Sequence, residues 1–131
     1  MDPARLRSLP LFRYLSAQQV EQVARWTEEL DVPAGLSLVE QGASPHEFFI
    51  IEEGTAEVLA DGRHVADLGP GDFFGEMALM ERERRAASVI ATSDVRLILM
   101  RGRDFREMAE AMPEVADTLR SALKQRAAEL G

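Results

Sequence analysis

The stretch GDFFGEMALMERERRAASV contains the residues of this chain that are best suited to binding a sugar phosphate. Gly75 allows a ligand to come close to the backbone, and a helical turn starting there would offer backbone N–H groups to an anion. Glu76 is an acceptor for sugar hydroxyls, and Arg85 has a planar set of donors that matches two phosphate oxygens. Ala86 and Ala87 are small enough to leave their backbone N–H groups accessible. Together these residues describe a sugar-phosphate site.

Each part of this pattern also has an ordinary structural explanation. A Gly-Glu pair is common in turns, and the run ERERR would serve equally well as a solvated charged surface. Asp67 and Asp72 flank a Gly-Pro-Gly turn and suit turn chemistry. His46 and His64 are isolated, with no carboxylate at metal-ligand spacing, so no metal site is expected. No Ser-His-Asp or Cys-His arrangement indicates catalysis.

Composition limits the classes of function. The 131 residues are 46% hydrophobic and 29% charged, as in an ordinary globular domain, and the formal net charge of -8 argues against nucleic-acid binding. The densest basic cluster is Arg82, Arg84 and Arg85. No apolar stretch is long enough to span a membrane, no signal peptide is apparent and cysteine is absent, so we expect a cytoplasmic protein without disulfides.

The elements that must position these residues change in type along the chain. Residues 1–27 have a helical pattern, with a capping box predicted at Ser16 and Gln19. Residues 28–101 contain short strand patterns separated by turn glycines, including a hairpin about Asp61-Gly62.

Residues 102–131 return to a helical period in two segments, with Pro113 at the start of the second. The pattern predicts a single domain over residues 1–131: a mainly β fold of sandwich, barrel or jelly-roll type with helices at both ends.

The anion-binding stretch resembles the phosphate-binding cassette of cyclic nucleotide-binding domains. The family pattern is Phe-Gly-Glu-(Leu/Met)-Ala-Leu, a short variable loop, and then Arg-(Ala/Ser/Thr)-Ala before an apolar strand. It stands here as Phe74-Gly75-Glu76-Met77-Ala78-Leu79 and, after the loop, Arg85-Ala86-Ala87-Ser88-Val89. The helical ends and the turn glycines also fit, so the resemblance covers practically the whole chain. One difference is Arg84, where the family often has proline.

The resemblance implies an eight-stranded antiparallel β roll that binds a cyclic nucleotide and is not an enzyme. In the family, the arginine at the position of Arg85 pairs with the cyclic phosphate, and the glutamate at the position of Glu76 bonds the ribose 2′-OH. Backbone N–H groups near Ala78 and Ala86 complete the phosphate contacts. The expected ligand-binding set is Gly75, Glu76, Met77, Ala78, Arg85, Ala86 and Ala87.

Ala86 bears on the choice of base. In cyclic nucleotide-dependent kinases, a threonine at this position accompanies a preference for cyclic GMP, because its hydroxyl can bond the guanine amino group. Alanine cannot form that bond, so we expect cyclic AMP as the ligand, with cyclic GMP second. No further cofactor is expected.

In this family the last helix folds over the base as a lid. The segment after Pro113 carries an apolar stripe at helical spacing, in which Leu119 and Leu123 are the side chains expected to meet the adenine or its surroundings. Because the sequence contains no kinase domain, channel pore or helix-turn-helix, we expect a stand-alone sensing domain. Its output would pass to a protein effector in trans or through self-association, without nucleic acid or membrane.

Two rival interpretations remain. A β roll of this family could have lost nucleotide binding and serve as an interaction domain, although the intact motif residues argue against that. An enzyme of the similarly shaped cupin class would need a cluster of metal-binding histidines, and the chain has only two histidines, far apart.

Overall fold

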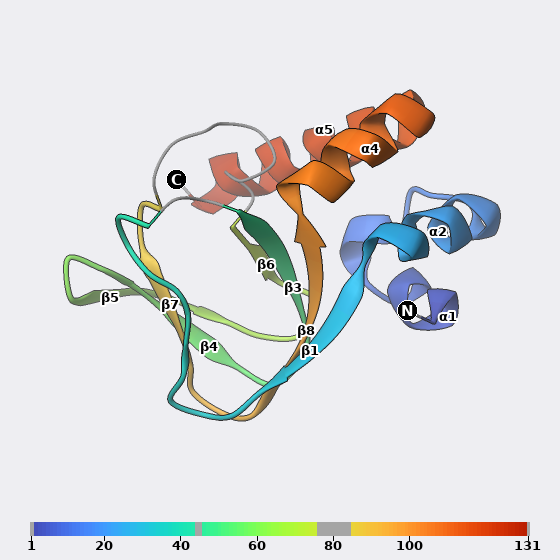
Figure 1. Cartoon of the computed structure of the whole chain (residues 1–131). Coiled ribbons are helices and arrows are strands. Elements are labelled where there is room, and N and C mark those ends of the chain that lie inside the picture. The colour runs from blue at the N-terminus through green and yellow to red at the C-terminus, as the bar shows by residue number, and fades with distance from the viewer. Residues whose placement is uncertain (1, 44–45, 76–84, 131) are drawn as a thin grey trace.

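Two four-stranded antiparallel sheets form the body of the molecule (Figure 1). The computed structural model describes residues 2–43, 46–75 and 85–130. The first sheet has the strand order β1 (Glu28–Val32), β8 (Val95–Arg101), β3 (Glu47–Glu53) and β6 (Phe73–Phe74). The second has the order β2 (Ser37–Val39), β7 (Ser88–Ala91), β4 (Ala56–Ala60) and β5 (Arg63–Leu68). The expected eight-stranded antiparallel β roll is therefore confirmed.

Helices flank the roll at both ends of the chain. The N-terminal part holds α1 (Pro3–Arg7), η1 (Pro10–Phe12), α2 (Ala17–Val23) and η2 (Ala24–Trp26), and the C-terminal part holds α4 (Gly102–Ala111) and α5 (Pro113–Leu130). Figure 1 shows both groups on the same side of the roll. Within the described residues, no helix is long and apolar enough to cross a membrane.

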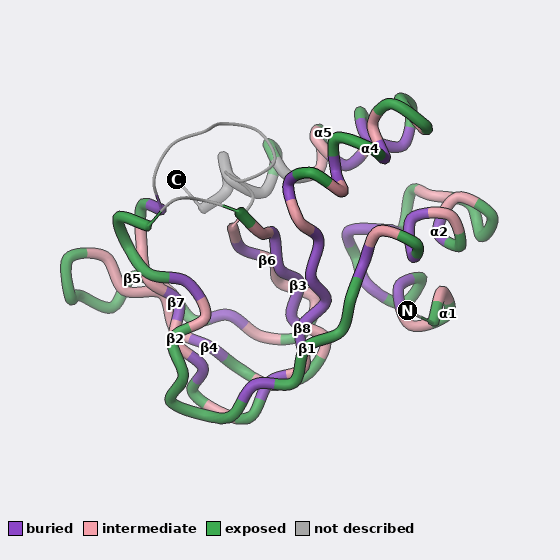
Figure 2. Tube along the Cα trace, in the orientation of Figure 1, coloured by how far each residue is buried: buried purple, intermediate pink, exposed green. Residues whose placement is uncertain are grey.

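The central strands β3 and β8 of the first sheet are buried on both of their faces (Figure 2). In β3, Phe49 and Ile51 pack between the two sheets, whereas Phe48 and Ile50 pack against the helices. The same alternation continues in β8, where Leu97 faces the roll interior. A strand that is buried on both faces needs apolar residues at every position, not at alternate ones. This explains the unbroken hydrophobic segments FFII in β3 and LILM in β8.

Local chemistry sets the ends of several elements as predicted. Ser16 accepts a hydrogen bond from the Gln19 backbone N–H at 3.1 Å, and the Gln19 side chain accepts one from the Ser16 N–H at 2.9 Å, so the capping box is confirmed. Asp61 and Gly62 have φ values of 53° and 76°, as a type I′ hairpin turn requires. Pro113 begins α5.

Strand β1 is the element that the sequence pattern did not locate. Four of its five residues are exposed, and three of these are acidic, so it lacks the alternation of a half-buried strand. It is held by pairing with β8 and by arginines: Arg101 donates to Glu28 at 2.8 Å, and Arg96 to Asp31 at 3.1 Å. The Arg101 hydrogen bond and charge hold the pKa of Glu28 below its usual value.

Candidate ligand-binding site

Arg85 is a nearly buried cation at the junction of the two sheets. It directly precedes the segment that leads into β7 of the second sheet, and its side chain is only 5% exposed. Gly75, which follows β6 at the edge of the first sheet, lies beside its guanidinium. Ten positions of sequence separate these two residues, and the fold brings them into contact.

The backbone and the side chain of Arg85 are both fixed. Its N–H donates to the carbonyl of Ala43 at 2.8 Å, and its carbonyl accepts from the N–H of Gly42 at 2.8 Å. Its Nη2 donates to the backbone carbonyl of Glu47 at 2.7 Å, and the Glu47 carboxylate lies 3.7 Å from the same nitrogen. A guanidinium held this way needs little reordering when an anion binds.

Gly75 is required by the position of Arg85. Its φ is +80°, in the left-handed region that favours glycine. A Cβ at this position would lie 2.6 Å from Arg85 Nη1 and 2.8 Å from the Glu47 carbonyl oxygen. The sequence argument assigned this open space to the ligand, whereas here the guanidinium and a carbonyl occupy it.

The remaining predicted contacts divide into two groups. Ala86 is exposed and Ala87 is half-buried, and both directly follow Arg85 on the way into β7. Glu76, Met77 and Ala78 lie outside the described residues, as do Arg82 and Arg84. The structure therefore brings Gly75 and Arg85 together, and Ala86 and Ala87 follow Arg85 directly in the chain.

Leu119 lies on the helical side of the first sheet. It is 4% exposed and packs in the cluster that joins the N-terminal helices, β3, β8, α4 and α5. There it lines a small apolar cavity with neighbours that include Phe12, Phe48 and Phe105. The side chain of Leu123 lies outside the described part of the chain. The first half of α5 is thus core, and the lid role of both leucines stays a prediction.

Glu47 is the residue near this site that sequence reasoning missed. Its backbone carbonyl accepts the Arg85 hydrogen bond, and it is 38 positions away in sequence. Because the contact uses the backbone oxygen, which every residue type has, no side-chain pattern could indicate it. The contact is visible only in the folded structure, where the two segments lie side by side.

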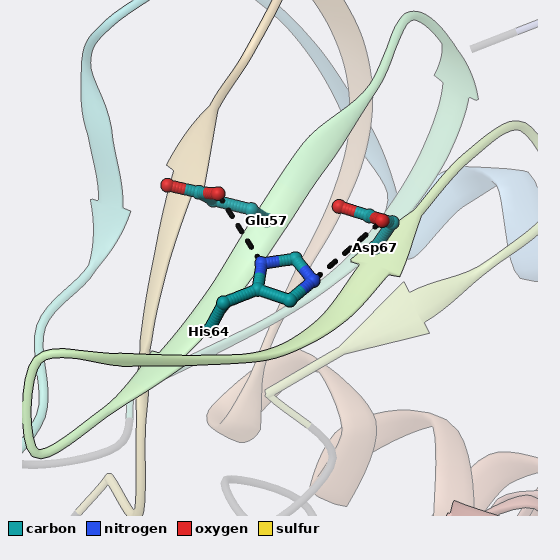
Figure 3. A group of neighbouring side chains, drawn as sticks. All are labelled: Glu57, His64 and Asp67. Carbon is teal, nitrogen blue, oxygen red and sulfur yellow. Dashed lines mark hydrogen bonds and ion pairs between the residues drawn. The ribbon is translucent and has the colours of Figure 1, made fainter.

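The prediction that His64 is isolated was wrong. Figure 3 shows its ring between two carboxylates, with Nδ1 3.3 Å from Glu57 Oε2 and Nε2 3.6 Å from Asp67 Oδ2. Asp67 lies within β5 and faces this histidine, so the turn role predicted for it was also wrong. Asp72 does have that role, since its carboxylate accepts from the Gly69 N–H at 2.8 Å.

Comparison with known proteins adds independent information. Residues 29–112 match the family model of the cyclic nucleotide-binding domain. A cyclic nucleotide-gated potassium channel of Rhizobium etli is 34% identical over 119 residues, which are 91% of this chain and 33% of the channel. The chain spans about a third of the length of the first curated relatives that it matches.

Solved structures of similar proteins have the same fold as this chain. A putative cyclic nucleotide-binding protein from Geobacter metallireducens has a TM-score of 0.83 at 26% identity, with 92% of this chain and 91% of that chain covered. The regulatory domain of Toxoplasma gondii PKA in co-crystals with cAMP has a TM-score of 0.81 at 28% identity, with 97% and 48% covered. In both cases nearly the whole of this chain is matched.

Proposed function

The chain belongs to the cyclic nucleotide-binding domain family, and we propose that it binds cyclic AMP and acts as a regulatory sensor of that ligand. The observation that carries the proposal is the buried guanidinium of Arg85, held beside Gly75. The Glu47 carbonyl holds this guanidinium through a hydrogen bond of 2.7 Å, and the planar donors of an arginine match two oxygens of a phosphate. A cyclic phosphate would supply a close, bidentate anion.

In this proposal each motif residue contacts a different part of the ligand. Arg85 pairs with the phosphate, and the backbone N–H groups of Ala86 and Ala87, together with those around Met77 and Ala78, complete the contacts with it. Glu76 accepts a hydrogen bond from the ribose 2′-OH, where its negative charge is kept from the phosphate. The relative in complex with cAMP and the shared order of the motif support this division.

Titration calorimetry with cyclic AMP and cyclic GMP tests the proposal and its selectivity. Wild-type protein is expected to bind cyclic AMP more tightly. Ala86→Thr should narrow or reverse that preference, because a hydroxyl at this exposed position can bond the guanine amino group. One hydrogen bond contributes about 0.5–1.5 kcal/mol, so the ratio of the two affinities should change by roughly two- to tenfold.

Ala17→Thr is a suitable control, because it adds the same side chain at an exposed position of α2, outside the proposed site. Absence of saturable binding of either nucleotide would refute the proposal and favour an interaction domain. Tighter binding of cyclic GMP by the wild type would overturn only the interpretation of Ala86.

We also propose that ligand binding changes the state of the C-terminal helix. Since Val115, Ala116 and Leu119 are buried in the core, the change should be limited to the part of α5 beyond them. Hydrogen exchange is expected to slow on addition of cyclic AMP in residues 120–130, while residues 113–119 stay protected with or without ligand. Equal exchange of residues 120–130 in both states would contradict a lid.

Truncation gives a second measurement. A chain ending after Ala122 keeps the buried half of α5 and should stay folded while it binds cyclic AMP more weakly. A chain ending after Met112 would lose three buried core residues, so its loss of binding could reflect unfolding.

A further inference from the structure

A second group of polar side chains lies on the outer face of the β4–β5 hairpin, away from the roll interior. Glu57 comes from β4, and His64 and Asp67 come from β5 (Figure 3). One potential ligand atom from each of the three lies within 4.8 Å of the other two. All three are accessible, with side-chain exposures of 34%, 49% and 81% in that order.

A β-bulge brings these three side chains onto one face. In a regular strand, residues three apart such as His64 and Asp67 point to opposite faces of the sheet. Here Glu57 lies opposite Asp67, whereas Leu59 lies opposite His64, and the register shifts between Val58 and Leu59. The shift inserts one extra residue into β5 and turns His64 to the side of Glu57 and Asp67. Bulges of this kind commonly re-aim a side chain toward a site.

We propose that Glu57, His64 and Asp67 bind a divalent transition cation of the zinc class. One imidazole nitrogen and two carboxylates are ordinary ligands for Zn²⁺, and the remaining coordination positions would be filled by water. Tetrahedral ligands at about 2.1 Å from a metal lie about 3.4 Å from each other. The three candidate ligand atoms lie within 4.8 Å of one another, so they would need to approach by at most about 1.4 Å to reach that separation.

Binding of the cation requires only a small rearrangement of the three side chains. The two carboxylates face different nitrogens of the ring, so one ion would use one nitrogen after rotation of the half-exposed His64 side chain. Among the described residues, no lysine or arginine forms an ion pair with Glu57 or Asp67, so none of the described cations competes for these carboxylates. The net charge of -8 favours cations generally.

Binding should join β4 to β5 at an edge of the second sheet. The chain has no cysteine and only one other histidine, so the unfolded chain offers few competing ligands. A ligand that binds the folded state stabilises it by mass action. Zinc should therefore raise the midpoint of thermal unfolding, and do so only while His64 is present.

The test is a Zn²⁺ titration of untagged, full-length protein by competition with a chromophoric chelator. Wild type is expected to bind one equivalent, and His64→Gln should abolish that binding. Glu57→Gln and Asp67→Asn should weaken it by at least about tenfold, since loss of even an outer-shell partner commonly costs that much. His46→Gln is the matched control, because it removes the other histidine, and it should leave the affinity unchanged.

Ring signals in NMR spectra give an independent readout, since the chain has only two histidines. Those of His64 should shift on addition of one equivalent of Zn²⁺, and those of His46 should not. Absence of saturable binding by wild type would overturn the proposal and leave His64 as an ion-pair partner only. Equal affinity in the His46→Gln and His64→Gln variants would overturn it as well.

Discussion

Replacement of Arg85 by alanine is expected to weaken cyclic AMP binding by about 30-fold or more, because removing one partner of a buried charge pair typically costs about 2–5 kcal/mol. The side chain is 5% exposed, so a phosphate beside it would be poorly solvated and would depend on its charge. Calorimetry of the purified variant measures the effect. Among the substitutions considered for binding, this one should have the largest consequence.

Two further variants separate charge from geometry. Arg85→Lys keeps a positive charge but loses the planar donors, so its affinity should fall between wild type and Arg85→Ala. Arg25→Ala removes an exposed arginine of η2 and should bind like wild type. Because Arg85 also donates to the Glu47 carbonyl, the unfolding midpoint of each variant must be measured. Unchanged affinity in a folded Arg85→Ala protein would remove Arg85 from the site.

Substitution of Gly54 by alanine is expected to lower the free energy of unfolding by about 3 kcal/mol. Gly54 has φ +95°, which costs a non-glycine residue roughly 1–2 kcal/mol. Its Cβ would also lie 2.7 Å from Val95 Cγ1 and 2.9 Å from Val95 Cα, and would clash with the carbonyl oxygen of Asp94. Two of these three neighbours are backbone atoms, so they cannot move aside cheaply. Urea denaturation measures the loss.

Gly35 supplies the matched control. Its φ is +90°, nearly that of Gly54, but no atom lies within 4 Å of the position of its Cβ. Gly35→Ala should therefore show the conformational cost alone, about 1–2 kcal/mol. If the two variants lost the same stability, close packing between the β3–β4 and β7–β8 turns would make no contribution.

These two glycines look alike in the sequence, since each stands in a turn between strands. Only the neighbour across the fold distinguishes them: Gly54 meets the turn before β8, which lies 40 positions later, whereas Gly35 meets solvent. The same holds for Gly75, whose close neighbours are the guanidinium of Arg85 and the Glu47 carbonyl. The residue type shows only that the backbone can adopt a positive φ at these positions. Whether a side chain would also clash there depends on the neighbouring atoms in the folded structure.

The sequence by itself determined the features that depend on a few adjacent residues. The capping box at Ser16, the hairpin turn at Asp61-Gly62, the helix start at Pro113 and the doubly buried strands all follow from local conformational preference or from an apolar run. The order of the motif residues also indicated the family and, with it, Arg85 as the central cation of the candidate site.

The tertiary structure decided what depends on residues that are far apart in the chain. The acidic strand β1 exists because β8 offers it a backbone ladder and arginines, not because of its own pattern. Leu119 points to the helical core because α5 packs on η1, and His64 meets Asp67 because of a bulge in β5. Backbone hydrogen bonds and register shifts use groups common to all residues. The positions of these hydrogen bonds and register shifts are therefore set by how the strands pair in the complete roll. Residue types in a short segment do not specify that pairing.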